Sequence, residues 1–223
     1  MNFMGLLKSL DELLYEVMSW IVFFPMTLWR VLRRPLTMMD YSDRELHQSA
    51  AEQYTDTLRP PLFLFLALLL SHALELAFIG SNELLSSKRG LAALVNDDTS
   101  LVLLRLVIFS VFPLMFAVRL VRAQRKRITR DSLRQPFYAQ CYAAAAFALT
   151  VGIGGLFATT HHWGWSQAAG WALNLFALLV YGIVQARWFA AHLKRSLAVG
   201  FGHASIAMVE SLILLALILP LFA

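Results

Sequence analysis

The sequence is poor in charged residues and almost free of cysteine, and each absence excludes a class of protein. A single cysteine, Cys141, cannot form a disulfide within the chain or build a multi-thiolate metal site. Only 15% of the 223 residues are charged, whereas 59% are hydrophobic. A soluble domain of this length cannot bury so much apolar surface in one core. We therefore expect a membrane protein whose excess apolar surface faces the lipid bilayer, with Cys141 as a buried packing residue.

Motifs for phosphate binding, metalloprotease chemistry, serine hydrolysis and dinucleotide binding are also missing from the chain. The sequence therefore predicts no enzyme, no catalytic residue, no metal and no cofactor. The net charge of +5 does not indicate nucleic-acid binding, because the arginines cluster between apolar runs, as membrane topology requires. No cleavable signal peptide is evident, since acidic residues interrupt the N-terminal apolar pattern.

Five apolar runs are each about as long as a membrane-crossing helix requires. At ~1.5 Å per residue, about 20 residues cross a ~30 Å hydrocarbon core. Backbone groups in lipid must be satisfied within the segment, so helices are expected. The sequence predicts an all-α polytopic bundle in which residues 60–223 form the transmembrane domain. The predicted spans are Pro60–Ile79, Leu101–Leu120, Ala139–Phe157, Ala168–Ala190 and Ile206–Phe222.

Arginine and lysine are concentrated in alternate connections. They precede the first run, join the second run to the third through Arg119–Arg134, and lie between the fourth and fifth. Because such residues stay in the cytoplasm, this bias predicts a cytoplasmic N-terminus and an external C-terminus. The stretch between the second and third runs is expected either to determine topology or to bind anionic lipid head groups. Its candidate residues are Arg122, Arg125, Lys126, Arg127 and Arg130.

The N-terminal region, residues 1–59, follows a different pattern. Apolar residues within Leu6–Met18 recur at helical spacing, with Lys8, Asp11, Glu12 and Glu16 on the other face, which predicts an amphipathic helix. It leads into Trp20–Trp29, a short apolar stretch interrupted by Pro25. We interpret this stretch as interfacial or re-entrant, and a sixth span with an external N-terminus is the alternative. Residues Asp40–Arg59 predict a short cytoplasmic linker or surface helix.

An arginine-rich stretch that ends in proline, Trp29–Pro35 (WRVLRRP), precedes the five spans, and little sequence follows them. In this arrangement the chain resembles the Yip family of five-span membrane proteins with a cytoplasmic N-terminus. The resemblance covers most of the chain and is one of topology. Eukaryotic members resemble trafficking adaptors that bind small GTPases, but the long N-terminal region used there is largely missing here. The resemblance therefore implies a bacterial relative in the cytoplasmic (inner) membrane.

Polar side chains at membrane depth are costly, so they are candidates for function. Glu75 near the outer end of the first run and Arg105 near the outer start of the second are both expected roughly 7 Å below the membrane boundary. An ion pair between them would be a gate, a substrate-binding charge or a structural clamp. His72 is expected on the same helical face as Glu75, either relaying protons, binding a metal, or bonded to a neighbouring span with Asn174 as partner.

Glu210 lies near mid-membrane in the fifth run, where no basic residue is expected at matching depth. Because an ionised carboxylate is costly in hydrocarbon, Glu210 is expected to be protonated. It would serve a proton-coupled step or a hydrogen bond across a subunit interface. Three glycines, Gly152, Gly154 and Gly155, favour close approach of helices, which predicts the third span at the centre of the bundle. The outer stretch His161–Trp165 suggests a metal site or an aromatic belt.

Two functions of different classes are consistent with these patterns. The first is a non-enzymatic membrane scaffold or accessory subunit of a larger complex, which binds a protein partner through the N-terminal helix or a transmembrane face. The acidic polar face of that helix favours a protein partner over anionic lipid. The alternative is a small permease or channel subunit in which Glu75, Arg105 and Glu210 line a path. Five spans without an inverted repeat would then require a homo-oligomer.

Overall fold

The computed structural model describes residues 3–49, 52–78, 98–159 and 165–218, with the side chains of 3–9 and 98–103 left aside. Within these ranges the chain forms seven helices and no strand, which confirms the predicted all-α fold. The helices are α1 (Phe3–Arg33), α2 (Pro35–Glu45), α3 (Pro60–Phe78), α5 (Asp98–Ala123), α6 (Arg130–Thr159), α7 (Ser166–Leu193) and α8 (Leu197–Ile218).

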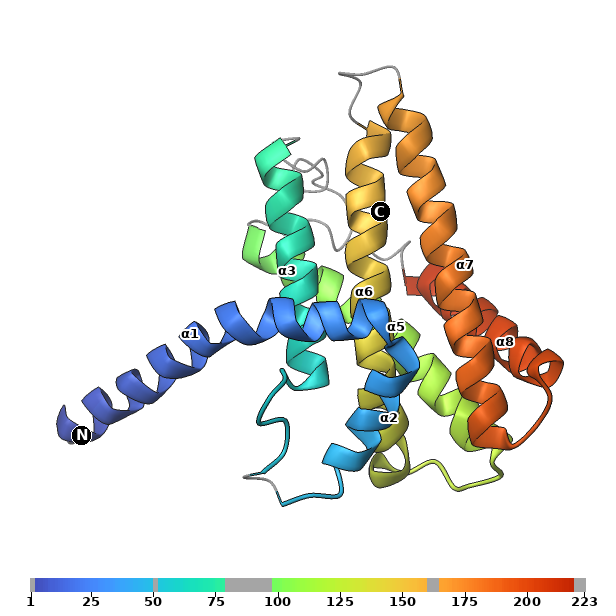
Figure 1. Cartoon of the computed structure of the whole chain (residues 1–223), viewed down its shortest axis with the longest axis horizontal. Coiled ribbons are helices and arrows are strands. Elements are labelled where there is room, and N and C mark those ends of the chain that lie inside the picture. The colour runs from blue at the N-terminus through green and yellow to red at the C-terminus, as the bar shows by residue number, and fades with distance from the viewer. Residues whose placement is uncertain (1–2, 50–51, 79–97, 160–164, 219–223) are drawn as a thin grey trace.

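Five of these helices, α3 and α5 to α8, are long and apolar enough to cross a membrane, in the order of the five predicted runs. Figure 1 shows α3, α6 and α7 side by side along the bundle, whereas α5 and α8 run obliquely across it. The start of α3 and the α5–α6 and α7–α8 connections lie at one end of the bundle. We call this the basic end, because Arg59, Arg125 and Lys194 belong to these segments. The opposite end is called the far end.

Two spans begin nine residues earlier than predicted. The fifth was expected from Ile206, but α8 begins at Leu197. Its first turns are held against α7: a Cβ on Gly200 would lie 2.2 Å from the carbonyl oxygen of Ala186. Glycine at this position therefore lets the two backbones touch, so the first turns of α8 pack directly on α7. The predicted end of this span at Phe222 lies outside the described residues.

The third span was expected from Ala139, but α6 begins at Arg130. A reciprocal cap explains the earlier start. The backbone N–H of Thr129 donates to Ser132 Oγ (2.9 Å), and the N–H of Ser132 donates to Thr129 Oγ1 (3.1 Å). Such a box satisfies two N–H groups that the first helical turn leaves without partners. The helix thus projects beyond its apolar segment at the basic end.

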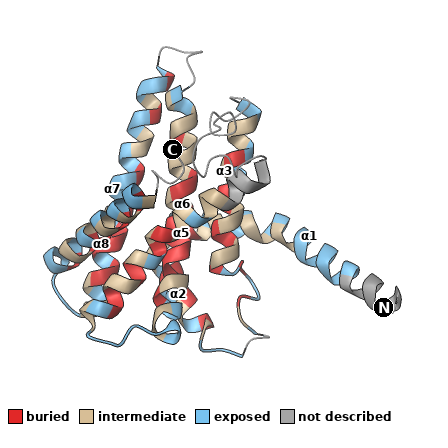
Figure 2. Cartoon of the chain, turned by 180° about the vertical axis from the view of Figure 1, so that it is seen from behind, coloured by how far each residue is buried: buried red, intermediate tan, exposed pale blue. Residues whose placement is uncertain are grey.

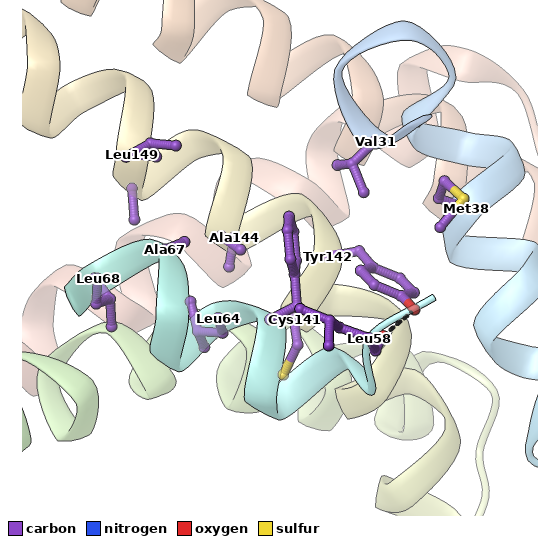
Figure 3. Close-up of a cluster of buried hydrophobic side chains, with 13 residues drawn as sticks. Val31, Met38, Leu58, Leu64, Ala67, Leu68, Cys141, Tyr142, Ala144 and Leu149 are labelled. Atoms are coloured by element: carbon purple, nitrogen blue, oxygen red, sulfur yellow. Dashed lines mark hydrogen bonds between the residues drawn. The ribbon is translucent and has the colours of Figure 1, made fainter. Parts of the chain in front are cut away.

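Helix α6 lies at the centre of the molecule and packs against α2, α3, α5 and α7, which confirms the predicted central position of the third span. Figure 3 shows one buried cluster in which residues of α3 and α6 meet residues of the N-terminal region, including Val31 and Met38. Cys141 is fully buried there, as predicted. The hydroxyl of Tyr142 donates to the carbonyl of Leu58 (2.7 Å), so the segment before α3 is attached to α6.

Helix α1 is continuous through Pro25, so the predicted interruption of the apolar stretch Trp20–Trp29 at this proline is wrong. Trp20, Phe23 and Leu28 pack on the cluster of Figure 3, and these contacts hold the turns on both sides of the proline in helical form. Helix α1 is not among the five span-capable helices, and Figure 1 shows it lying across the bundle, not along it. This placement favours the interfacial interpretation over a sixth span.

The segment before α3, predicted as a short cytoplasmic linker or a surface helix, begins within α2 and contains both exposed and buried residues. The side chains of Ser42 and Thr57 are buried, and the carboxylate of Glu45 accepts a hydrogen bond from the backbone N–H of Tyr54. The N–H of Leu58 donates to the Thr27 hydroxyl of α1 (3.2 Å). Hydrogen bonds among polar groups replace water here, which is why a polar sequence can be buried. Residues 1–59 and 60–223 therefore share one core.

The two halves of the bundle differ in packing. Figure 2 shows the buried residues concentrated where α2, α5 and α6 meet near the basic end, whereas the far-end parts of α3, α6 and α7 are mostly half-buried or exposed. Large apolar side chains near the far end, such as Phe78, Trp171 and Phe176, are more than half exposed. Apolar side chains exposed on span-capable helices are expected to face lipid.

Candidate functional site

The predicted ion pair between α3 and α5 is present. Arg105 Nη2 lies 2.5 Å from Glu75 Oε2, and the two side chains are 21% and 28% exposed. Both belong to the far-end half of the bundle, where α6 packs against α3 and against α5. Residue counting places Glu75 and Arg105 at nearly the same depth below the outer membrane boundary, and this was enough to predict their contact.

A cavity of about 320 Å³ adjoins this pair, and we call it the ion-pair cavity. Helix α3 contributes Ser71 and Glu75, α5 contributes Arg105 and Phe109, and α6 closes the third side with residues that include Gly155. Its volume lies at the lower end of the ~300–1,000 Å³ typical of small-molecule pockets. The cavity is open on one side, so the pair faces a half-open pocket and is not enclosed by packed side chains.

The other two predicted residues of this region do not join the pair. His72 is buried on α3 and is not among the residues that line the ion-pair cavity. Asn174 is not its hydrogen-bond partner, so that expectation is wrong. Helix α6 lies between α3 and α7, and Asn174 packs on it: a Cβ on Gly154 would lie 2.0 Å from Asn174 Oδ1. Sequence depth alone gave no information on which way each side chain turns.

Glu210 has a basic neighbour, so the expectation that no basic residue lies at its depth is wrong. Arg119 Nη1 of α5 lies 3.6 Å from Glu210 Oε1, and Arg119 Nε donates to His203 Nδ1 (3.2 Å). Arg119 was assigned to the basic connection, but it is a residue of α5. Helices α5 and α8 both run obliquely across the bundle (Figure 1). Two residues can therefore meet even though residue counts along their helices place them at different depths in the membrane. The second Glu210 oxygen is buried and makes no hydrogen bond among the described residues.

A buried amide pair was missed by the sequence analysis. Gln140 of α6 and Gln185 of α7 are fully buried and exchange two hydrogen bonds between their amides, at 2.8 and 2.6 Å. Each amide satisfies the other in a region without water, so the pair joins the two helices. The sequence does contain a signal for this pair, because Gln140 and Gln185 are polar residues inside two predicted apolar runs.

The five basic candidates at the basic end are all exposed. Arg122 is in the last turn of α5, and Arg130 begins α6. Arg125 adopts a left-handed backbone (φ 57°) that ends the helix, and its N–H donates to the carbonyl of Arg122 (2.9 Å). Their positions suit either contact with lipid head groups or a topological role, and both stay predictions. Lys126 and Arg127 lie between Arg125 and Arg130 in the connection that joins α5 to α6.

At the basic end, α2 is joined to α7 by a contact between a histidine and an aspartate. His192 Nε2 lies 3.4 Å from Asp43 Oδ2, while His192 Nδ1 interacts with the carbonyl of Trp188 (3.0 Å). Burial raises the pKa of nearby Asp40 above its ordinary value, although His192 partly offsets the shift. This contact attaches the N-terminal region to the fourth span and was not predicted.

Helix α1 presents an exposed apolar surface. Its outer part projects from the bundle, as Figure 2 shows, and Leu13, Leu14, Met18 and Ile21 are each more than half exposed. Asp11 and other acidic residues, Glu12 and Glu16, are also exposed on this part of the helix. We call the four apolar residues the α1 stripe.

No group of three or more potential metal-ligating side chains is found in the part of the chain that the structure describes. His161 and His162, which suggested a metal site, lie outside the described residues. Trp165 at the start of α7 is exposed, as an aromatic belt would require.

Comparisons of the chain with protein family models, with curated proteins and with solved structures found no match. The resemblance to the Yip family therefore stays a prediction, and the site must be interpreted from its own geometry.

Proposed function

We propose that the protein is a non-enzymatic scaffold or accessory subunit of a larger membrane complex, and that it binds a partner protein through the α1 stripe. The observation that carries this proposal is the projecting half of α1, whose apolar side chains are exposed within the part of the chain that the structure describes. Exposed apolar surface of this kind marks interaction sites in folded proteins.

The charge of α1 favours a protein over a lipid surface as the occupant. Helices that lie on membranes are usually rich in lysine and arginine on the polar face, because cytoplasmic leaflets are anionic. The described polar side chains of the projecting half include Asp11, Glu12 and Glu16 and no basic residue. A partner with an apolar groove bordered by basic residues complements this pattern. The proposal includes a bacterial cytoplasmic membrane, a basic end that faces the cytoplasm, and membership of the Yip family.

Crosslinking in intact membranes tests the proposal. A photo-crosslinking residue replaces Leu14 or Met18 of the stripe, and Glu12 of the acidic face is the matched control position. We expect a discrete protein adduct from the first two positions and little from the third. Leu14→Glu is expected to abolish co-purification of that protein, while Glu12→Gln preserves it. Adducts with lipid alone, or equal adducts from all three positions, contradict the proposal.

The alternative is a small permease or channel subunit that acts as an oligomer, and the ion-pair cavity is the observation that favours it. The three charges proposed to line its path are nevertheless divided between two clusters. Glu75 pairs with Arg105, whereas Glu210 pairs with Arg119, roughly 21 Å further along α5. Solute flux in proteoliposomes that is lost in both Glu75→Gln and Glu210→Gln would support the permease. Silent wild-type proteoliposomes support the scaffold.

A further inference from the structure

The Glu75–Arg105 pair has two properties that a purely structural clamp does not need. Its charged groups line a cavity of about 320 Å³, and they remain 28% and 21% exposed in a span-capable part of the chain. A pair that served packing alone would be most stable when enclosed by side chains, since interiors are close-packed. Here space has been left beside both charges.

Helix α6 keeps that space open through a glycine that packing does not explain. A Cβ on Gly152 would lie 2.0 Å from Ser71 Oγ, and a Cβ on Gly154 would collide with Asn174, so both glycines are in close contact with neighbouring side chains. A Cβ on Gly155 would meet nothing within 4 Å, and Gly155 lines the ion-pair cavity. Glycine is disfavoured within helices, and its effect here is to enlarge the cavity.

The charges of the cavity define what it can hold. An anion or a cation alone would compete for one member of the pair and break its contact with the other, which is costly in a low-dielectric region. A zwitterion avoids this cost, because its anionic group meets Arg105 while its ammonium group meets Glu75. We propose that the ion-pair cavity binds a small zwitterion that carries an ammonium group and a carboxylate or phosphate.

The side chains present suit each half of such a ligand. The Arg105 guanidinium offers parallel N–H donors that match a carboxylate or phosphate in two-point contact. Glu75 accepts from the three N–H donors of an ammonium group, and the Ser71 hydroxyl lies on the same wall. Phe109 supplies an apolar side for the carbon atoms of the ligand.

Two sources share this chemistry, a lipid head group such as phosphoethanolamine and a free amino acid. Helices α3 and α5 each pack extensively along α6 but touch one another little. The cavity therefore lies where two spans are least closely packed, which is compatible with entry from the bilayer or from the water phase. This inference does not depend on the scaffold proposal, because the α1 stripe and the cavity are separate surfaces.

Binding is measured with the full-length protein purified in a neutral, non-zwitterionic detergent, by thermal shift and native mass spectrometry. The probes are phosphatidylethanolamine, phosphatidylglycerol, free phosphoethanolamine and glycine. We expect saturable binding of at least one ammonium-bearing zwitterion and no comparable binding of phosphatidylglycerol. Binding that requires acyl chains identifies a lipid, whereas binding of a free probe identifies a soluble ligand.

Variants connect that binding to the cavity. Gly155→Leu places a side chain in the open space and should abolish binding, while Gly202→Leu is the control, since a Cβ there also meets nothing but lies on α8. The double variant Glu75→Gln with Arg105→Gln keeps the site neutral, and should weaken binding by about thirtyfold or more because both charge partners are lost. Equal binding of phosphatidylglycerol, no binding of any zwitterion, or unchanged binding by folded Gly155→Leu overturns the proposal.

Discussion

The two halves of the helix bundle hold their polar groups in different ways. Near the basic end, the amides of Gln140 and Gln185 are fully enclosed and satisfy each other. In the far-end half, Glu75 and Arg105 form an ion pair beside a cavity. The comparison teaches that the basic half has the features of a structural core, whereas the far half keeps charges accessible. Function is more often found where packing is incomplete.

The largest effect is expected at the far-half ion pair. Arg105→Leu removes the cation that pairs with Glu75 Oε2 in a span-capable part of the chain, and should lower the free energy of unfolding by about 3 kcal/mol. Arg119→Leu should cost about 1 kcal/mol, because its contact with Glu210 is longer, at 3.6 Å, and lies closer to the end of α5. Unfolding titrations in mixed micelles measure both losses.

The control for this comparison is Glu75→Gln combined with Arg105→Gln, which removes both charges and should recover most of the loss. Equal destabilisation by Arg105→Leu and Arg119→Leu would show that depth in the bundle does not distinguish the pairs.

The enclosed amide pair should respond less strongly, though in a similar pattern. Gln185→Leu leaves both polar groups of the Gln140 amide buried without partners, and should cost about 2 kcal/mol. Replacing both glutamines by leucine should be nearly neutral, because no unpaired polar group remains. The same titrations apply, and a double variant less stable than the single one would indicate that the amides have a role beyond satisfying each other.

The smallest effect is expected outside the bundle, where water screens the charges. Burial alone would raise the pKa of Asp56, but the hydrogen bonds from Arg30 (2.7 Å) and Tyr41 (2.7 Å) hold it below its ordinary value. A lowered folded-state pKa adds stability above the unfolded value of about 3.9, and that stability is lost as the pH falls through the folded value. Because the Arg30 and Asp56 side chains are 39% and 55% exposed, the contribution should be at most about 1 kcal/mol.

Thermal unfolding of wild type and Asp56→Asn at pH 6 and pH 3 measures this difference. The wild type should be the more stable only at pH 6, and Glu12→Gln is the control for a carboxyl group on the exposed face of α1. A difference that persists at pH 3 would assign the effect of Asp56 to packing and not to charge.

Only part of the site was predictable before the structure. The Glu75–Arg105 contact followed from counting residues, because α3 and α5 are consecutive and antiparallel and both residues lie near the same end. The contact of Arg119 with Glu210 did not follow, since counting assumes that helices run along the bundle. The prediction that Asn174 is the hydrogen-bond partner of His72 was wrong for a related reason, because residue counting gives the depth of a side chain but not the direction in which it points.

The sequence by itself determined that this is a membrane protein, how many helices are able to cross a bilayer, and in which order basic connections alternate. These properties are local, because the length of an apolar run and the charge of a loop do not depend on neighbours. Only the tertiary structure decided the tilt of α5 and α8, the continuity of α1 through Pro25 and the opening beside Gly155. Tilt, rotation and cavities are set by how helices pack against one another, and no single segment contains that information.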